Sequence, residues 1–233
     1  MIRASSLGKL MASAKSIDPS LITEEVKAIQ KKPVAKRTEP EKELLAKLLQ
    51  DTLPDGAITE LDKIISQKLL NWRDEIDFLT LEKGRHCEDE SIELYNDLYD
   101  TFYLKNTERV TRENLTGECD ILDLDESLVI DIKTAYSKKT YPLFLKISTL
   151  YEWQLRAYMY LYNVDNAELA YCLVDTPLEF RKKSDPNTWH EMHDVPENLR
   201  VSKLRISRDL EKENQMLRRI ELSMNYINEH IGV

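Results

Sequence analysis

The sequence predicts an α/β protein in which strands are flanked by helices. Residues 117–134 read as two β-strands joined by a tight acidic turn at 125–127. The second strand, at 128–132, is almost continuously apolar, which is typical of a strand buried on both faces. Apolar residues recur at helical spacing before and after this hairpin, notably at 41–53 and 149–162. Strand and helix patterns in one chain define the predicted fold class.

Length and composition describe a globular domain. The chain has 233 residues, enough for one domain with a sizeable core and insertions. A content of 42% hydrophobic and 32% charged residues is typical of a soluble globular protein and not of a disordered or membrane protein. The sequence lacks an apolar run of about eighteen residues, and its N-terminus lacks the apolar region of a signal peptide. We therefore expect a cytoplasmic protein without a membrane partner.

Charge and cysteine content restrict the function further. A net charge of −9 argues against tight, non-specific binding of nucleic acid by the whole surface, but it is compatible with a local basic groove. The cysteines, Cys87, Cys119 and Cys172, are widely separated and form no C-x-x-C pair. They predict neither a disulfide framework nor a zinc or iron–sulfur site, so we expect reduced core residues.

The N-terminal segment has two alternative interpretations. Residues 2–11 predict a short strand followed by a Ser-capped helix. This helix is either a plain packing element or, through Ser5 and Ser6 at its N-terminus, a phosphate-binding element. Residues 18–41 are polar and contain three prolines, which predicts a long mobile loop.

The other elements follow from periodicity and turn residues. In chain order they are helices at 41–53 and at 57–79 (with Ile76 in the apolar stripe), a helix after Gly84, strands at 107–114, 167–175 and 201–206, polar loops at 135–146 and 180–198, and a long amphipathic helix at 209–231 with Leu210 facing inward. His190 and His193 lie in the second loop without further metal-ligand residues nearby in sequence, so we interpret them as loop residues.

Charged residues interrupt the apolar strand of the hairpin. Asp131 and Lys133 are two positions apart, so both side chains point to the same face, about 7 Å apart along the strand. Burying an unpaired charge is costly, so the pair is either a private ion pair or part of a charged site. Asp120, on the preceding strand, is expected near the same end. Two carboxylates and a lysine suit Mg²⁺ or Mn²⁺ chemistry.

Two further polar residues lie on apolar helix faces. Glu88 is at i, i+4 and i+7 spacing with Ile92 and Tyr95, which places it on the inward stripe unless it is a capping or surface glutamate. Gln154 and Tyr158 share one face of the helix at 149–162.

These residues together resemble a known family. Asp120, followed after ten residues by Asp131-x-Lys133, resembles the core motif of the PD-(D/E)XK nucleases, and Gly117 also fits. Glu118-Cys119 stands where the motif has a residue and proline. Glu88 before the motif and Gln-x-x-x-Tyr after it are similar to lambda-type phage exonucleases, YqaJ-like viral recombinases and RecB-like nucleases.

The resemblance implies a fold and an activity. The fold would be a restriction-endonuclease-like core, a mixed β-sheet flanked by helices, in a single nuclease domain over 1–233. A loop and helical insertion would occupy 15–80, the catalytic core 81–176 and a C-terminal helix 208–231. The activity would be hydrolysis of linear duplex DNA, 5′ to 3′, in phage-type recombination or DNA processing in a bacterial or phage-infected cell.

The resemblance also implies roles for individual residues. One or two Mg²⁺ or Mn²⁺ ions would be bound by Glu88, Asp120, Asp131 and the carbonyl of Ile132, with Lys133 and Gln154 completing the catalytic set. DNA would be contacted by Ser5, Ser6, Ser137, Lys138, Arg156 and Tyr158. The implied partners are DNA, a single-strand annealing protein and further copies of the chain, in a trimer.

Two alternatives stay open. One is an endonuclease of the same superfamily, although the missing cysteine cluster disfavours a Cas4-like enzyme. The other is a non-catalytic DNA-binding or assembly module with the same fold, which the intact Asp120, Asp131 and Lys133 disfavour.

Overall fold

A four-stranded mixed sheet forms the centre of the protein. The computed structural model describes residues 1–72 and 79–232. The strand order is β4-β5-β6-β7, with β5 and β6 parallel and both outer pairs antiparallel. The bounds are β4 (Ile121–Asp123), β5 (Leu128–Thr134), β6 (Asn166–Cys172) and β7 (Val201–Ser207). The predicted mixed α/β fold is therefore confirmed.

A smaller sheet lies beside the first. Its order is β1-β3-β2, from β1 (Ile2–Arg3), β3 (Leu115–Gly117) and β2 (Val110–Arg112). The strand predicted at 107–114 is thus shorter than expected. The tight turn of the hairpin lies at 124–127, as predicted, and connects β4 to β5.

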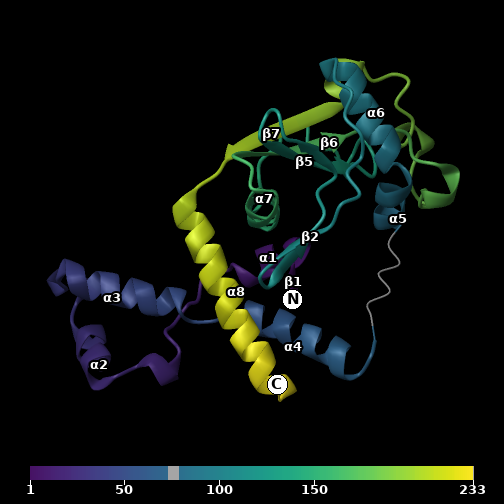
Figure 1. Ribbon diagram of the computed structural model, residues 1–233. Coiled ribbons are helices and arrows are strands. Elements are labelled where there is room, and N and C mark those ends of the chain that lie inside the picture. The colour runs from purple at the N-terminus through teal and green to yellow at the C-terminus, as the bar shows by residue number, and fades with distance from the viewer. Residues whose placement is uncertain (73–78, 233) are drawn as a thin grey trace.

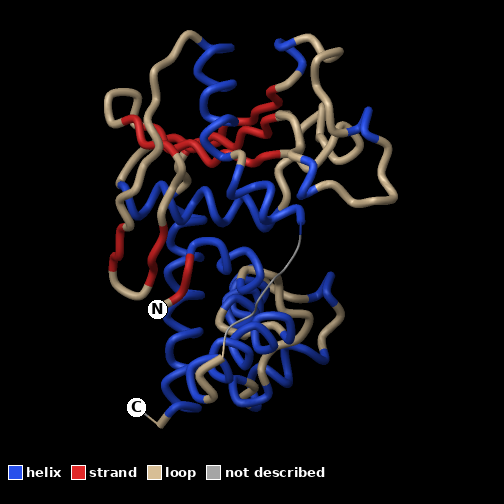
Figure 2. The backbone as a smooth tube through the Cα atoms, turned by 90° about the vertical axis from the view of Figure 1, so that its right-hand side faces the viewer, coloured by secondary structure: helices blue, strands red, loops and turns tan. Residues whose placement is uncertain are grey.

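Helices cover both faces of the large sheet. One face packs against α6 (Glu88–Tyr99) and the opposite face against α7 (Thr149–Tyr162), as Figures 1 and 2 show from two sides. Ile130 and Ile132 belong to the core beneath α6, whereas Val129 belongs to the core around α7. Because side chains alternate along a strand, Asp131 points toward α7.

The predicted C-terminal helices are confirmed. The bounds of α7 equal the predicted ones, with the Ser148 hydroxyl accepting a hydrogen bond from the N–H of Tyr151. In α8 (Leu210–Ile231), Asp209 caps the first turn. This helix runs from the large sheet down to α4 (Asp55–Leu69) (Figure 1). Leu210, expected to face inward, is 66% exposed because it begins the helix beyond the core.

The N-terminal helix differs from its prediction in its cap. In α1 (Ala4–Leu10), Arg3 occupies the N-cap position without a side-chain hydrogen bond, and Ser5 and Ser6 lie in the first turn. The predicted Ser cap is wrong because the helix begins earlier. Gly8 packs directly on Leu150 of α7: a Cβ added to it would lie 2.4 Å from the Cα of Leu150.

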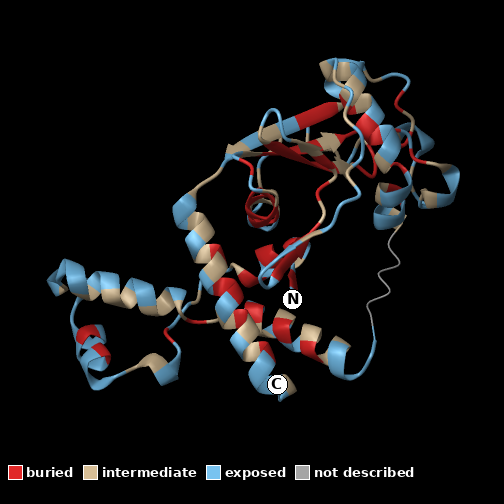
Figure 3. Cartoon of the chain, in the orientation of Figure 1, coloured by how far each residue is buried: buried red, intermediate tan, exposed pale blue. Residues whose placement is uncertain are grey.

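The predicted long loop at 18–41 is partly helical. It contains α2 (Glu24–Lys31), in which Thr23 caps the N–H of Val26 and two apolar residues are buried. Short 3₁₀ turns, η1 (Pro19–Leu21) and η2 (Val34–Lys36), flank this helix, and α3 (Glu39–Gln50) follows with a capping box. The loop prediction fails because the prolines lie outside α2 rather than within it. Both helices lie away from the large sheet and are mostly exposed (Figure 3).

Two segments meet at the end of the sheet where the site lies. Gly84 lies within α5 (Leu79–His86), a helix that was not predicted, and the expected helix with Glu88, α6, follows after one residue. The predicted loop at 180–198 is built on 3₁₀ turns, η3 (Leu178–Phe180), η4 (Asn187–Trp189) and η5 (Glu197–Leu199), and η3 packs against α5. The expected packing residue Ile76 lies outside the described residues.

The cysteine prediction is confirmed, since Cys87, Cys119 and Cys172 are all free and buried. Within 1–72 and 79–232, every helix is too short or too polar to cross a membrane.

Candidate functional site

The hairpin brings Asp120 to β5. In the antiparallel ladder Ile121 pairs with Ile130, so Asp120, one residue before β4, lies across from Asp131. Oδ2 of Asp120 accepts a hydrogen bond of 2.6 Å from the backbone N–H of Ile132. The carboxyl group is therefore fixed against β5, as the sequence predicts.

Asp131 and Lys133 form an ion pair on the face that points toward α7. Oδ2 of Asp131 lies 2.6 Å from Nζ of Lys133, and the Asp131 side chain is only 1% exposed, against 25% for Lys133. The Lys133 Nζ also lies 3.4 Å from the carbonyl oxygen of Ile132 and 5.8 Å from the centroid of the Tyr151 ring. The ion pair envisaged from the sequence is present, at the edge of a cleft.

Gln154 holds the other oxygen of Asp131. Its Nε2 donates to Oδ1 of Asp131 at 3.3 Å and to the hydroxyl of Tyr158 at 2.9 Å. The two residues one helical turn apart on α7 thus form a chain to β5. The Gln-x-x-x-Tyr pair has a structural reason: the amide orients a buried carboxylate, and the tyrosine orients the amide.

Burial and charge crowding shift the titration of this cluster. The pKa of Asp120 is raised to about 7. Burial is the main cause and the Asp131 carboxylate adds to it, whereas the Lys133 ammonium opposes the rise. Burial alone lowers the pKa of Lys133, but the carboxylates of Asp131 and Asp120 outweigh it and raise that pKa overall. The cluster therefore favours additional positive charge.

Glu88 is near the cluster but has another partner. It begins α6, and its Oε1 lies 3.2 Å from Nζ of Lys105. Among the residues that the structure describes, no three acidic, histidine or cysteine side chains are grouped closely enough to hold a metal ion. The predicted meeting of three acidic groups is thus not assembled in this structure.

A cleft of about 530 Å³ opens beside Asp120 and Lys133. It is lined by Thr80, Leu81, Gly84, Arg85, Glu88, Asp120, Ile132, Lys133, Thr134, Ala135, Tyr136, Thr140, Tyr151, Tyr171 and Lys182. Glu88 and Asp120 thus face the same space from different elements. Charged groups of both signs in one concave site suit a ligand that carries phosphates and cations.

The donor set fits a hard divalent cation. Asp120, Asp131 and Glu88 offer carboxylate oxygens, and Ile132 offers a carbonyl, which are the ligand types preferred by Mg²⁺ and Mn²⁺. Oδ2 of Asp131 is buried, and among the described residues its polar contact is the ion pair with Lys133. A cation would stabilise the ionised form of this crowded set.

The predicted DNA-contacting residues are distributed unevenly. None of the six lines the cleft. Arg156 and Tyr158 are buried on α7, and Arg156 pairs with Glu152 at 2.9 Å, so neither is presented on the surface. Their expected contact with DNA is not favoured, because side chains used for core packing cannot reach a ligand outside.

The loop after β5 is closer to the cleft. Ser137 is buried, and its N–H donates to Oγ1 of Thr140, a residue of the cleft wall. Lys138 pairs with Asp194, and Ser5 and Ser6 lie on α1. The structure therefore leaves DNA contacts by these four residues as predictions.

Sequence reasoning missed three cationic residues near the site. Lys105 is the partner of Glu88, and Arg85 and Lys182 line the cleft. Arg85 has a weak signal, since it lies only three residues before Glu88 in the sequence. Lys182 has no such signal in the sequence, because a polar loop at 180–198 has the same composition whether or not it folds back on a site.

Solved structures with the same architecture are nucleases. The protein aligns over 99% of its length with 95% of a phage-related exonuclease of Haemophilus somnus 129PT, with a TM-score of 0.81 and 23% identity. It aligns over 99% with 89% of an alkaline exonuclease of Laribacter hongkongensis, with a TM-score of 0.63 and 12% identity. The complex of that exonuclease with dAMP aligns at a TM-score of 0.56 and 14% identity, over 98% and 92% of the two chains. At these identities the likeness defines the fold class.

Sequence comparison makes the assignment specific. No curated protein matches the sequence significantly. The model of the PD-(D/E)XK nuclease superfamily matches residues 20–226. The chain belongs to the PD-(D/E)XK nuclease superfamily, which confirms the resemblance carried by Asp120, Asp131 and Lys133. It is a nuclease, and nucleases of this superfamily generally use divalent metal ions.

Proposed function

We propose that the protein is a metal-dependent exonuclease that degrades linear duplex DNA from the 5′ end. The observation that carries the proposal is that Asp120 and Lys133 line one cleft, with the buried Asp131 paired to Lys133, in a member of a nuclease superfamily. The exonuclease likeness of the fold supports release of nucleotides from ends rather than internal cutting.

Each residue of the site has a proposed role. Glu88, Asp120 and Asp131, with the carbonyl of Ile132, would bind one or two Mg²⁺ or Mn²⁺ ions. Such an ion supplies an activated water and stabilises charge on the phosphate. The Lys133 ammonium, protonated beside Asp131, would orient the attacking water and offset charge on the scissile phosphate. Gln154 would keep Asp131 in the orientation it has in this structure.

Glu88 would have to exchange its partner for this role. Its ion pair with Lys105 is solvent-accessible, with side chains 21% and 40% exposed, so it is cheap to open. A divalent cation at Asp120 would compete with Lys105 for the Glu88 carboxylate. The third acidic ligand is thus available from a position that already lines the cleft.

The assembly state is proposed from the lambda-type likeness alone. We propose a homo-oligomer, a ring-shaped trimer, that acts with a single-strand annealing protein. Light scattering coupled to size-exclusion chromatography tests the first part: a mass near three chains of 27.3 kDa supports it, and a monomer at all concentrations contradicts it.

One digestion experiment tests the activity. End-labelled linear duplex and closed circular duplex are incubated with Mg²⁺ and with chelator, and the linear substrate carries its label at the 5′ or the 3′ end in separate reactions. Metal-dependent loss of linear DNA alone, with early release of the 5′ label, supports the proposal. Nicking of circles indicates an endonuclease, and absence of metal-dependent cleavage indicates a non-catalytic DNA-binding module.

A further inference from the structure

The cleft is lined by two cationic side chains in addition to its acidic residues. Arg85 from α5 and Lys182 from the segment after β6 line the same cleft as Glu88 and Asp120. Both cations are exposed, and neither forms an ion pair with any residue in 1–72 or 79–232. By contrast, Lys133 is paired with Asp131. Arg85 and Lys182 are therefore cations of the cleft wall whose charge is not neutralised within the described protein.

The backbone at Lys182 is held in place. The Tyr136 hydroxyl accepts a hydrogen bond of 2.9 Å from the N–H of Lys182 and donates one of 2.9 Å to the carbonyl of Phe180. The Lys182 Nζ lies 5.6 Å from the centroid of the Tyr136 ring. Because Tyr136 is only 5% exposed, it fixes the loop to the end of β5.

The rest of this segment is anchored at the same place. The Thr176 hydroxyl donates to the Tyr136 carbonyl at 2.7 Å, and Nε of Arg181 donates to the Thr176 carbonyl at 2.6 Å. Arg181 also pairs with Glu191 at 3.0 Å. A surface lysine on such a braced turn loses less conformational freedom on binding than one on a free loop.

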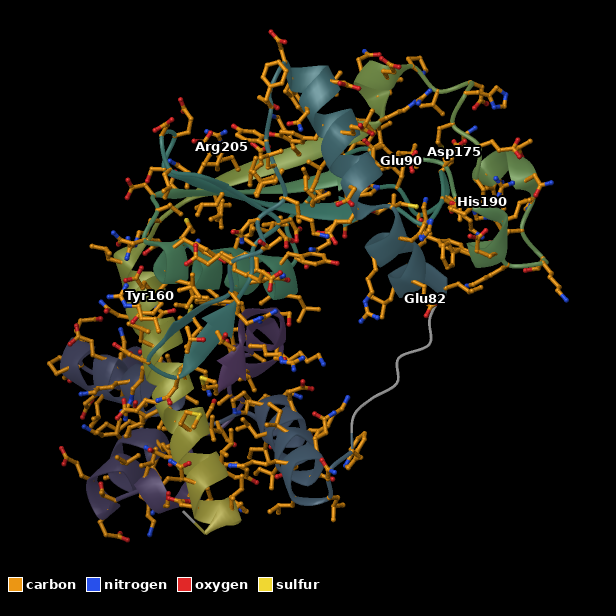
Figure 4. The ribbon with its side chains drawn as sticks, turned by 45° about the vertical axis from the view of Figure 1, so that its right-hand side comes forward. Glu82, Glu90, Tyr160, Asp175, His190 and Arg205 are labelled. Carbon is orange, nitrogen blue, oxygen red and sulfur yellow. The ribbon has the colours of Figure 1, made fainter. Side chains whose placement is uncertain are left out.

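Arg85 is carried by a helix with an equally fixed position. The fully buried Lys83 of α5 donates to the carbonyls of Ala135, Tyr136 and Val174 at 2.7, 3.3 and 2.9 Å. Figure 4 shows α5, with Glu82, beside the segment that carries Asp175 and His190. Both cations are thus mounted on elements tied to the ends of β5 and β6.

We propose that Arg85 and Lys182 form a phosphate-binding subsite that contacts the DNA strand beside the scissile position. The proposal rests on the proposed function, since the phosphate is that of the nuclease substrate. A guanidinium binds phosphate oxygens bidentately, and an ammonium adds a point charge. In a protein of net charge −9, affinity for a polyanion must come from local cations of this kind.

Binding measurements with matched variants test the subsite. A fluorescent duplex is titrated with wild type, Arg85→Ala, Lys182→Ala, the double variant and the control Lys183→Ala, with Ca²⁺ in place of Mg²⁺, over a range of KCl. Lys183 is the adjacent lysine, outside the cleft. Each single variant is expected to raise Kd about 5- to 10-fold and to reduce the slope of log Kd against log salt by about 0.9. Lys183→Ala is expected to bind like wild type, and Lys182→Arg to restore most of the loss.

Kinetics and substrate ends complete the test. In Mg²⁺, Arg85→Ala and Lys182→Ala are expected to lower kcat/KM mainly by raising KM. A merely destabilised fold would not produce this pattern. An effect confined to 5′-phosphorylated DNA assigns the subsite to a terminal phosphate, and an equal effect on 5′-hydroxyl DNA assigns it to an internal phosphodiester.

The two proposals fail in distinguishable ways. If wild type cleaves DNA but the double variant matches Lys183→Ala in Kd and salt slope, the subsite alone is overturned. If wild type does not cleave DNA but the variants bind DNA more weakly than wild type, the subsite is supported and the proposed activity is overturned.

Discussion

Asp120 and Ile132 join the two strands of the β4–β5 hairpin through a hydrogen bond of 2.6 Å from the Ile132 N–H to Oδ2 of Asp120. This bond places one carboxyl group across from Asp131 and beside Lys133. It also leaves Asp120 buried next to a second acid, so that its pKa is raised to about 7, first by burial and then by the Asp131 charge. The protein's own groups therefore leave the negative charge of Asp120 and Asp131 only partly neutralised, which favours a bound cation.

Removal of Lys133 is expected to destabilise the protein through Asp131. In Lys133→Met the 1% exposed Asp131 loses its ion-pair partner, at a cost of about 2–4 kcal/mol in the free energy of unfolding. The double variant Asp131→Asn/Lys133→Met is expected to regain most of this stability without regaining activity. Urea unfolding in chelator measures both. A single variant as stable as wild type would show that the ion pair is dispensable.

Lys105 is expected to compete with the metal ion. In Lys105→Met the Glu88 carboxylate loses its 3.2 Å partner and becomes free for a cation. Because such an exposed pair is worth about 1 kcal/mol or less, the Mg²⁺ concentration for half-maximal cleavage should fall, by about 5-fold at most. Metal titrations of the cleavage rate measure this, with Lys183→Met as the control. A rise in the required Mg²⁺ would contradict the role given to Glu88.

Lys83 is expected to be needed for stability. Lys83→Met removes three hydrogen bonds to backbone carbonyls in a site with 0% exposure, which should lower the free energy of unfolding by about 2–4 kcal/mol. Burial lowers the pKa of this lysine to about 8, which means that wild type already bears a free-energy cost for burying the ammonium group. Denaturant unfolding at pH 7 measures the change. Equal stability of variant and wild type would mean that the charge and the hydrogen bonds cancel.

His190 is expected to make the protein less stable in mild acid. It is fully buried, and burial, assisted by the charge of Arg181, lowers its pKa below the ordinary value of 6.5. As the pH falls, His190 therefore takes up a proton in the unfolded chain before it does so in the folded protein. The contribution of neutral His190 to the free energy of unfolding is present above about pH 6.5 and is lost as the pH falls through the folded pKa. His190→Gln should gain stability relative to wild type between pH 8 and 5.5, as measured by thermal unfolding. A pH-independent difference would exclude this contribution.

The predictable parts of the fold depend on local signals. The bounds of α7 were predicted because apolar and aromatic residues recur at helical spacing within 149–162. The pairing of Asp120 with Asp131 was predicted because a tight turn fixes the register of a hairpin. The α2 helix was missed although Thr23 and two acidic residues begin it, because the polar composition and the prolines on either side are also typical of a loop.

The unpredicted parts depend on contacts between distant segments. Lys105 reaches Glu88 across the turn after α6, and Lys182 reaches the cleft because the segment after β6 folds back on Tyr136. Periodicity carries no information about such contacts. The burial of Arg156 was missed for a similar reason: its partner Glu152 is local, but Glu152 also pairs with Lys212 of α8, a contact between distant segments.

The most direct measurement of the central claim is Mg²⁺-dependent digestion of end-labelled linear duplex by wild type and by Asp120→Asn. Asparagine keeps an oxygen that can accept from the Ile132 N–H, so circular dichroism and thermal unfolding should show an intact fold. We expect wild type to degrade the duplex only with metal, and Asp120→Asn to be slower by about 1,000-fold or more. An Asp120→Asn protein that degrades the duplex at the wild-type rate would contradict the account.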